Sequence, residues 1–149
     1  MSIGELCNRE VVITQADESL PAAARLMREH HVGDVVVVEQ REGRNVPVGI
    51  LTDRDIVVEL VAEEVDPQSV RVADVMSSRL LTLNEGENLL ESIQRMRGAG
   101  VRRAPVVDAD GGLIGIFTLD DLLEVLADAL SDLSTLTRQG QRRERAARG

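Results

Sequence analysis

Aromatic residues are almost absent from the sequence: Phe117 is the only one, and there is no Trp or Tyr. This scarcity excludes nucleic-acid binding by base stacking on several aromatic rings. All seventeen basic residues are arginines, which excludes lysine Schiff-base chemistry and a phosphate-loop lysine. The hydrophobic content of 43% is nevertheless sufficient for a core of aliphatic and Met side chains.

Cysteine and long apolar runs are also scarce. Cys7 is the single cysteine, which excludes an intrachain disulfide and a multi-cysteine metal site. No apolar run approaches the ~20 residues of a membrane span, and the start MSIGELCNRE lacks the basic and apolar regions of a signal peptide. We therefore expect a soluble cytoplasmic protein without a membrane partner.

The charge is acidic overall and unevenly distributed. The formal net charge is −9, yet residues 138–149 carry five Arg and one Glu. An acidic chain is a poor general nucleic-acid binder, so nucleic-acid binding through this tail is the weakest functional hypothesis. We expect the tail to be disordered and solvated.

The chain repeats itself at an offset of 69 residues, and at 66 after one turn of different length. Residues 3–39 align with 72–108, and Gly49–Asp55 aligns with Gly115–Asp121. Identical residues recur in the first block at Leu20 and Leu89, Met27 and Met96, Arg28 and Arg97, Val32 and Val101, Val37 and Val106, and Val38 and Val107.

Each copy has the pattern strand, helix, strand, strand, helix. The strands are expected at Val11–Thr14, Val35–Val38 and Val46–Leu51, and at Leu80–Leu83, Ala104–Val107 and Leu113–Phe117. The central strands are continuously apolar, which predicts burial of both faces. The intervening turns are expected at Gln40–Asn45 and Asp108–Gly112.

This order predicts a mixed α/β (α+β) fold of two βαββα repeats packed with pseudo-twofold symmetry, because one three-stranded sheet alone buries too little surface. The predicted divisions are repeat one (3–64), a linker (65–71), repeat two (72–130), and a helix extension with the basic tail (131–149).

The segment Gly-apolar-apolar-Thr-x-x-Asp, present twice at the end of a βαββ unit, resembles the CBS domain. The supporting residues are Val101–Asp108 leading into Gly115–Asp121, and the resemblance covers about residues 3–127. The chain looks most like small stand-alone bacterial proteins made of one CBS pair. The first copy departs from the pattern at Val36, which stands where the second has Pro105, and at Gly33-Asp34, which stand where the second has Arg102-Arg103.

The resemblance implies a regulatory module that binds AMP, ADP or ATP, and in some members S-adenosylmethionine, in the clefts between the repeats. In that family the motif Asp binds the ribose hydroxyls and the motif Thr or Ser contacts phosphate. The expected ligand-binding residues are Val12, Val32, Thr52, Asp55, Arg102 and Arg103, together with Leu81, Val101, Thr118 and Asp121.

Physical chemistry supports these roles but also supplies an alternative. A carboxylate can accept hydrogen bonds from both hydroxyls of a vicinal diol, and a helix N-terminus favours an anion. However, Thr-x-x-Asp at a helix start is also a capping box, which stabilises the helix without any ligand. Both readings remain open at Thr52/Asp55 and at Thr118/Asp121.

Arg102 and Arg103 are either a phosphate clamp or a solvated, salt-bridged pair. The pseudo-twofold should carry them toward the cleft of Asp55, while Gly33 and Asp34 should face the cleft of Asp121. We therefore expect the Thr52 site to take the more highly charged ligand.

Other candidate residues have structural interpretations. His30 and His31 are neighbours near a helix C-terminus, where a dipole contact is favoured over a metal site. Cys7 aligns with Met76 and is expected to be a small buried residue. No catalytic constellation is recognisable, so we expect no enzymatic activity and no cofactor other than the regulatory nucleotide.

The last helix carries a leucine stripe that continues beyond the repeat. Its members are Leu119, Leu122, Leu126, Leu130, Leu133 and Leu136. The part after Ala127 has no repeat to cover it, which predicts a homodimer. The leading hypothesis is an adenine-nucleotide sensor acting on a separate regulated protein, and the alternative is a structural or interaction module without a ligand.

Overall fold

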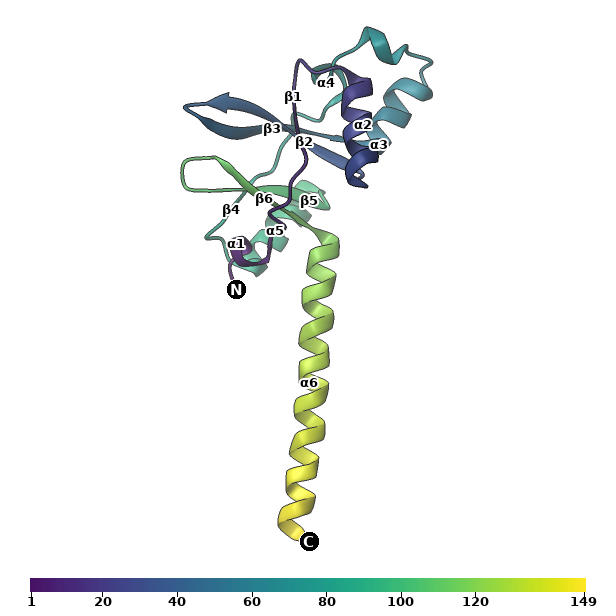
Figure 1. Ribbon diagram of the computed structural model, residues 1–149. Helices are drawn as coiled ribbons and strands as arrows, with labels where there is room; N and C mark the ends of the chain where they lie inside the picture. Colours follow the sequence, from purple (N-terminus) through teal and green to yellow (C-terminus); the bar gives the residue numbers. More distant parts are fainter. The chain divides into compact units, whose positions relative to one another are not determined.

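The computed structural model describes residues 1–149 as two compact units, Met1–Phe117 and Thr118–Gly149, which are considered separately (Figure 1). The first unit contains both sheets. Its elements in the first repeat are α1 (Ile3–Leu6), β1 (Ile13–Gln15), α2 (Leu20–His30), β2 (Asp34–Arg41), β3 (Arg44–Thr52), α3 (Asp53–Ile56) and a π-helical turn η1 (Val57–Val61). A short 3₁₀ turn, η2 (Pro67–Ser69), leads into the second repeat.

The second repeat has the same order of elements. It contains α4 (Val72–Val75), β4 (Leu83–Asn84), α5 (Leu89–Ala99), β5 (Arg103–Val107) and β6 (Leu113–Thr118). Helices α4 and α5 begin and end 69 residues after α1 and α2, which is the offset found in the sequence. The mixed α/β fold class and the repeat are thereby confirmed.

Each repeat forms a three-stranded sheet, in the orders β1-β2-β3 and β4-β5-β6. The first strand of each repeat pairs parallel with the second, and β2 pairs antiparallel with β3. Val35 and Val37 belong to the core cluster under α2, whereas Val36 and Val38 pack with Ile116 of the other sheet. Both faces of β2 are therefore buried, as the continuous apolar run predicts.

The β2–β3 hairpin is longer than the sequence indicates. The expected turn Gln40–Asn45 shrinks to Glu42-Gly43, because Arg41 and Arg44 still pair across the strands. Both turn residues have positive φ, 51° at Glu42 and 78° at Gly43. Two such residues match the twist of a hairpin, and only the second is a glycine that signals this geometry.

The leading segments of the two repeats are exchanged. The segment before β1 pairs with the second repeat through Asn8 and Ile116, and the segment before β4 pairs with the first through Ser77 and Ile50. These two bridges are related by the repeat offsets, and they bind each sheet to the other copy. The exchange buries Ile3 and Val72 completely, one from each repeat.

This exchange explains the glycine of the repeated motif. A Cβ built on Gly49 would lie 2.7 Å from Met76 Sδ and 2.9 Å from the Ser77 carbonyl oxygen. A Cβ on Gly115 would lie 2.6 Å from Cys7 Sγ and 2.8 Å from the carbonyl oxygen of Asn8. Glycine is required because the crossing backbone passes where a side chain would stand. Cys7 is half-buried rather than fully buried.

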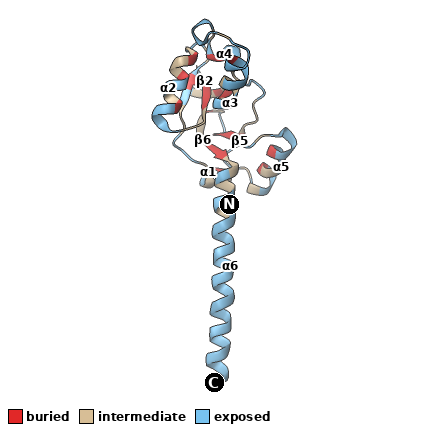
Figure 2. Cartoon of the chain, turned by 90° about the vertical axis from the view of Figure 1, so that its right-hand side faces the viewer, coloured by how far each residue is buried: buried red, intermediate tan, exposed pale blue.

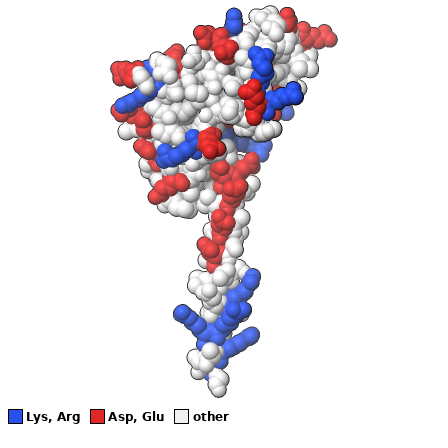
Figure 3. Space-filling model, viewed as in Figure 1, with Lys and Arg blue, Asp and Glu red and all other residues white.

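The second unit is dominated by one helix, α6 (Leu119–Arg148). The expected disorder of residues 138–149 is wrong in this structure, where the helix continues to Arg148. Arg, Gln, Glu and Ala dominate this segment and are strong helix formers. Nearly all of α6 is exposed (Figure 2), with acidic side chains along its first half and arginines toward its end (Figure 3). No helix of the chain has the length and apolar character needed to cross a membrane.

Candidate functional site

The first Thr–Asp set lies where β3 ends and α3 begins. Thr52 has extended backbone angles, φ −109° and ψ 159°, and is the N-cap of α3. Its Oγ1 accepts a hydrogen bond from the Asp55 N–H at 3.1 Å, while the Thr52 N–H donates to Asp55 Oδ2 at 2.9 Å. These reciprocal bonds are a complete capping box, so the capping interpretation is confirmed at this position.

The second set repeats this arrangement at the start of α6. Thr118 Oγ1 accepts from the Asp121 N–H at 3.2 Å, and the Thr118 N–H donates to Asp121 Oδ2 at 2.8 Å. The Thr118 hydroxyl also donates to Asp121 Oδ2 at 2.8 Å. No such contact joins Thr52 Oγ1 to the Asp55 carboxylate, so the Thr52 hydroxyl proton remains available to an acceptor.

Capping leaves part of each carboxylate unused. In both sets the hydrogen bonds go to Oδ2, and Oδ1 of Asp55 and of Asp121 accepts none. Both aspartates are half-buried. A diol could therefore bind Oδ1 while the cap stays intact, so helix capping and ribose binding are compatible.

Two of the residues expected to contact adenine lie together in the first repeat. Val12 and Val32 line the same open pocket of about 740 Å³, beside β1 and the end of α2. The rest of its lining is Asn8, Arg9, Glu10, Val11, Ile13, Leu26 and His30. Thr52 and Asp55 do not line it. Leu81 and Val101 occupy the equivalent positions of the second repeat and are also half-buried.

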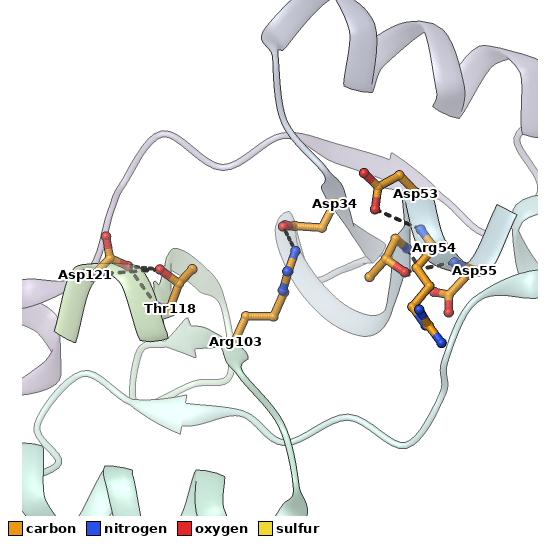
Figure 4. A network of polar contacts seen from close by, with 8 residues as sticks. Asp34, Asp53, Arg54, Asp55, Arg103, Thr118 and Asp121 are labelled. Carbon is orange, nitrogen blue, oxygen red and sulfur yellow. Dashed lines mark hydrogen bonds and ion pairs between the residues drawn. The ribbon is translucent and has the colours of Figure 1, made fainter. Parts of the chain in front are cut away.

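The arginine pair has the arrangement of the structural alternative, with one residue salt-bridged and the other solvated. Arg103 forms an ion pair with Asp34, with their side chains 35% and 20% exposed (Figure 4), and Arg102 is exposed. Sequence reasoning assigned Arg103 and Asp34 to opposite clefts, and this separation is wrong. The two residues occupy equivalent positions, 69 apart, and two equivalent positions can contact each other only near the axis that relates the repeats.

The strand register places this ion pair beside the first Thr–Asp set. Asp34 is the partner of Thr52 across β2 and β3, and the Asp53 N–H donates to the Gly33 carbonyl at 2.9 Å. The carboxylates of Asp34, Asp53 and Asp55 thus belong to neighbouring positions at one sheet end (Figure 4). Arg103 reaches this end of the sheet from the other repeat.

Sequence reasoning missed Asp34 as the partner of Arg103, and it missed Arg9 and His30 as pocket residues. Opposite charges at aligned positions were the signal for the ion pair. His30 was assigned only a helix-dipole contact, and it does lie in the last turn of α2. No group of three or more His, Cys, Asp or Glu side chains is arranged to hold a metal ion.

A tandem pair of βαββ repeats with a capped Thr–Asp set after each third strand defines a recognisable class of protein. The CBS domain model matches residues 3–62 and again residues 72–128. The chain belongs to the CBS domain family.

The chain is also similar to two relatives and to one solved structure. An uncharacterized protein of Methanopyrus kandleri is 38% identical over 125 residues, 84% of this chain and 62% of the relative, so the chain spans less than two thirds of that protein. The CBS domain-containing protein YhcV of Bacillus subtilis is 36% identical over 121 residues, 81% of this chain and 82% of the relative.

The solved structure is the CBS domain pair of protein MJ0100 in complex with 5′-methylthioadenosine and S-adenosyl-L-methionine. It matches with a TM-score of 0.74 at 19% identity, covering 87% of this chain and 98% of that one. At this identity the likeness concerns the fold.

Proposed function

We propose that the chain is a non-catalytic regulatory module that binds adenosine-containing ligands, namely AMP, ADP or ATP, and signals to a separate protein. The observation that carries this proposal is the pair of Thr–Asp sets, each with one carboxylate oxygen free of hydrogen bonds. The CBS pair of MJ0100 supports it from outside, since both ligands in that complex contain adenosine.

In the first repeat we assign the ribose, phosphate and adenine contacts to a few residues. Asp55 Oδ1 accepts the ribose hydroxyls, and the free hydroxyl of Thr52 donates to phosphate. Val12 and Val32 provide an apolar surface for adenine. Arg103, with Arg102 beside it, supplies positive charge for the phosphate. Asp121 offers the same ribose contact in the second set, whereas the Thr118 hydroxyl proton is already donated to Asp121 Oδ2.

The test is thermal unfolding with adenosine, AMP, ADP, ATP and S-adenosylmethionine, because a ligand specific to the folded state raises the unfolding temperature. We expect at least one of them to stabilise the wild type and to lose this effect in Asp55→Ala/Asp121→Ala. Asp74→Ala is the matched control, since it removes the same kind of cap from α4 and should keep the ligand response. A wild type that responds to none of the five ligands contradicts the proposal.

The second candidate is an interaction module without a nucleotide ligand. The exposed leucines of α6 favour it, at 55% for Leu123, 48% for Leu126, 67% for Leu130, 60% for Leu133 and 65% for Leu136. This candidate predicts no thermal response to nucleotides and a loss of binding to its partner when the leucine stripe is altered.

The same stripe supports a homodimer in which α6 pairs with α6 of a second copy. The leucines recur at spacings of three and four, so they share one face, while the acidic residues of 120–132 lie on the opposite face. An antiparallel pair that aligns Leu126 with Leu130 places the arginine-rich end of each helix alongside the acidic first half of the other. A parallel pair would instead place like charges together.

Light scattering tests this assembly at micromolar concentration. We expect a mass of two chains for the wild type and one chain for Leu130→Asp/Leu133→Asp. Leu90→Asp is the matched control, because Leu90 is equally exposed, at 68%, but lies on α5. A monomeric wild type, or a double variant that stays dimeric, contradicts pairing through α6.

A further inference from the structure

The Asp34–Arg103 ion pair joins equivalent positions of the two repeats. The residues are 69 apart, and each is the first residue of the central strand of its repeat, β2 or β5. Such a contact lies on the axis relating the copies. A repeat with identical residues here would bring two like charges together, so the opposite charges are a property of this sequence and not of the fold.

The ion pair also lies next to the proposed phosphate position. Asp34 is in register with Thr52, whose hydroxyl has a free proton, and Asp53 and Asp55 follow within one helical turn. Arg103 reaches this end of the sheet from the other repeat. Its guanidinium group is already paired with the Asp34 carboxylate.

We infer that Asp34 is a specificity-determining residue that competes with ligand phosphate for Arg103. This inference rests on the proposed function and adds the control of ligand charge. Phosphate has to share Arg103 with the Asp34 carboxylate or displace that carboxylate, and the two anions repel each other. Adenosine makes no demand on Arg103, so its binding is independent of Asp34. Asp34 thus reduces the difference in binding affinity between adenosine and its phosphorylated forms.

A purely structural role makes a different prediction. If the ion pair only holds the repeats together, its loss weakens the fold and affects adenosine, AMP and ATP alike. If Asp34 competes with phosphate, its neutralisation releases the guanidinium and strengthens only the phosphorylated ligands. The sign of the change separates the two roles, because a structural loss cannot tighten binding of one ligand class selectively.

The experiment compares calorimetric titrations of adenosine, AMP and ATP into the wild type, Asp34→Asn and Asp34→Asn/Arg103→Gln. Asp53→Asn is the matched control: it removes one charge from the same sheet end, where its carboxylate lies near Gly33, without releasing Arg103. We expect Asp34→Asn to bind AMP and ATP about tenfold more tightly, which corresponds to ~1.4 kcal/mol, with adenosine unchanged. The gain should disappear in the double variant.

The nucleotide titrations overturn the inference if they show equal gains in Asp34→Asn and Asp53→Asn, parallel weakening of all ligands in Asp34→Asn, or a gain that persists in the double variant. Inorganic tripolyphosphate, titrated into the same proteins, separates this inference from the proposed function. If adenosine and its nucleotides bind no variant while tripolyphosphate still prefers Asp34→Asn, the nucleotide proposal fails and the charge control stands. If tripolyphosphate binds wild type and Asp34→Asn equally, the charge control fails.

Discussion

The two repeats share a backbone but differ in the polar groups attached to it. Their paired helices α1 and α4, and α2 and α5, have identical lengths at a constant offset, and Gly49 and Gly115 admit the same crossing segment. In contrast, repeat one has Asp34 where repeat two has Arg103. The glycines that admit the crossing segment are the same in both repeats, whereas the charged residue at the axis differs.

A second difference lies at the start of the long helix of each repeat. Glu87 accepts hydrogen bonds from the Asn84 N–H at 2.9 Å and from the buried Ser92 hydroxyl at 3.2 Å, and it pairs with Arg95. The equivalent Glu18 is exposed, and its carboxylate accepts a hydrogen bond only from the adjacent Ser19 N–H. Repeat two therefore uses a polar network where repeat one uses apolar packing.

Breaking the shared feature should have the largest effect. We expect Gly49→Ala and Gly115→Ala each to destabilise the protein by about 1–3 kcal/mol, because the new Cβ overlaps backbone of the exchanged segment. Chemical denaturation measures this loss. Gly98→Ala is the control: this helical glycine has open space around its Cβ position, so the substitution should stabilise by roughly 1 kcal/mol. Comparable losses at all three positions would show that the crossing does not require glycine.

The polar network of repeat two should give a smaller, pH-dependent effect. Partial burial opposes ionisation, but hydrogen bonds from the Asn84 N–H and Arg95 hold the pKa of Glu87 below its usual value. A lowered folded-state pKa means that the stabilisation is present above the unfolded value of about 4.3 and is lost as the pH falls through the folded one. We expect Glu87→Gln to cost about 1–2 kcal/mol at pH 7.

Denaturation of Glu87→Gln at pH 7 and near pH 3 tests this expectation, and the difference from wild type should shrink at the lower pH. Glu18→Gln, at the same place in repeat one, should have little effect at either pH. Equal losses of stability in both variants at pH 7 would show that the hydrogen bonds of Glu87 stabilise the fold no more than that of Glu18 does.

The smallest stability effect is expected at the axis. Asp34→Arg places two guanidinium groups together and should cost about 1 kcal/mol, a modest value because both side chains are partly solvated. Asp34→Arg/Arg103→Asp restores opposite charges in the reversed order and should recover most of the loss. Failure of this charge swap to recover stability would place the pair away from a true axis of the repeats.

Much of this comparison could be predicted from sequence. The offset of 69 located the helices, and the run Val35–Val38 indicated burial on both faces. The Arg103–Asp34 contact could not be derived from pattern alone, because it depends on where the axis passes in three dimensions. The Glu42-Gly43 turn was hidden for a similar reason, since positive φ at a glutamate has no compositional signal.

The candidate site was predicted in its residue types but not in its bonding. The sequence identified Thr52/Asp55 and Thr118/Asp121 as either caps or ligand contacts. Only coordinates show that a cap consumes one carboxylate oxygen and that the two threonine hydroxyls differ in their remaining capacity. A residue pattern cannot predict which individual atoms within one helical turn are hydrogen-bonded.

The two Thr–Asp sets are unequal in their free hydrogen-bonding groups, and we expect the first to bind the phosphorylated ligand. Calorimetric titration of AMP into wild type, Asp55→Ala and Asp121→Ala tests it directly, with Asp74→Ala as the control for loss of a helix cap. We expect Asp55→Ala to abolish AMP binding, whereas Asp121→Ala and Asp74→Ala should retain it. Loss of binding in Asp121→Ala with full binding in Asp55→Ala would contradict it.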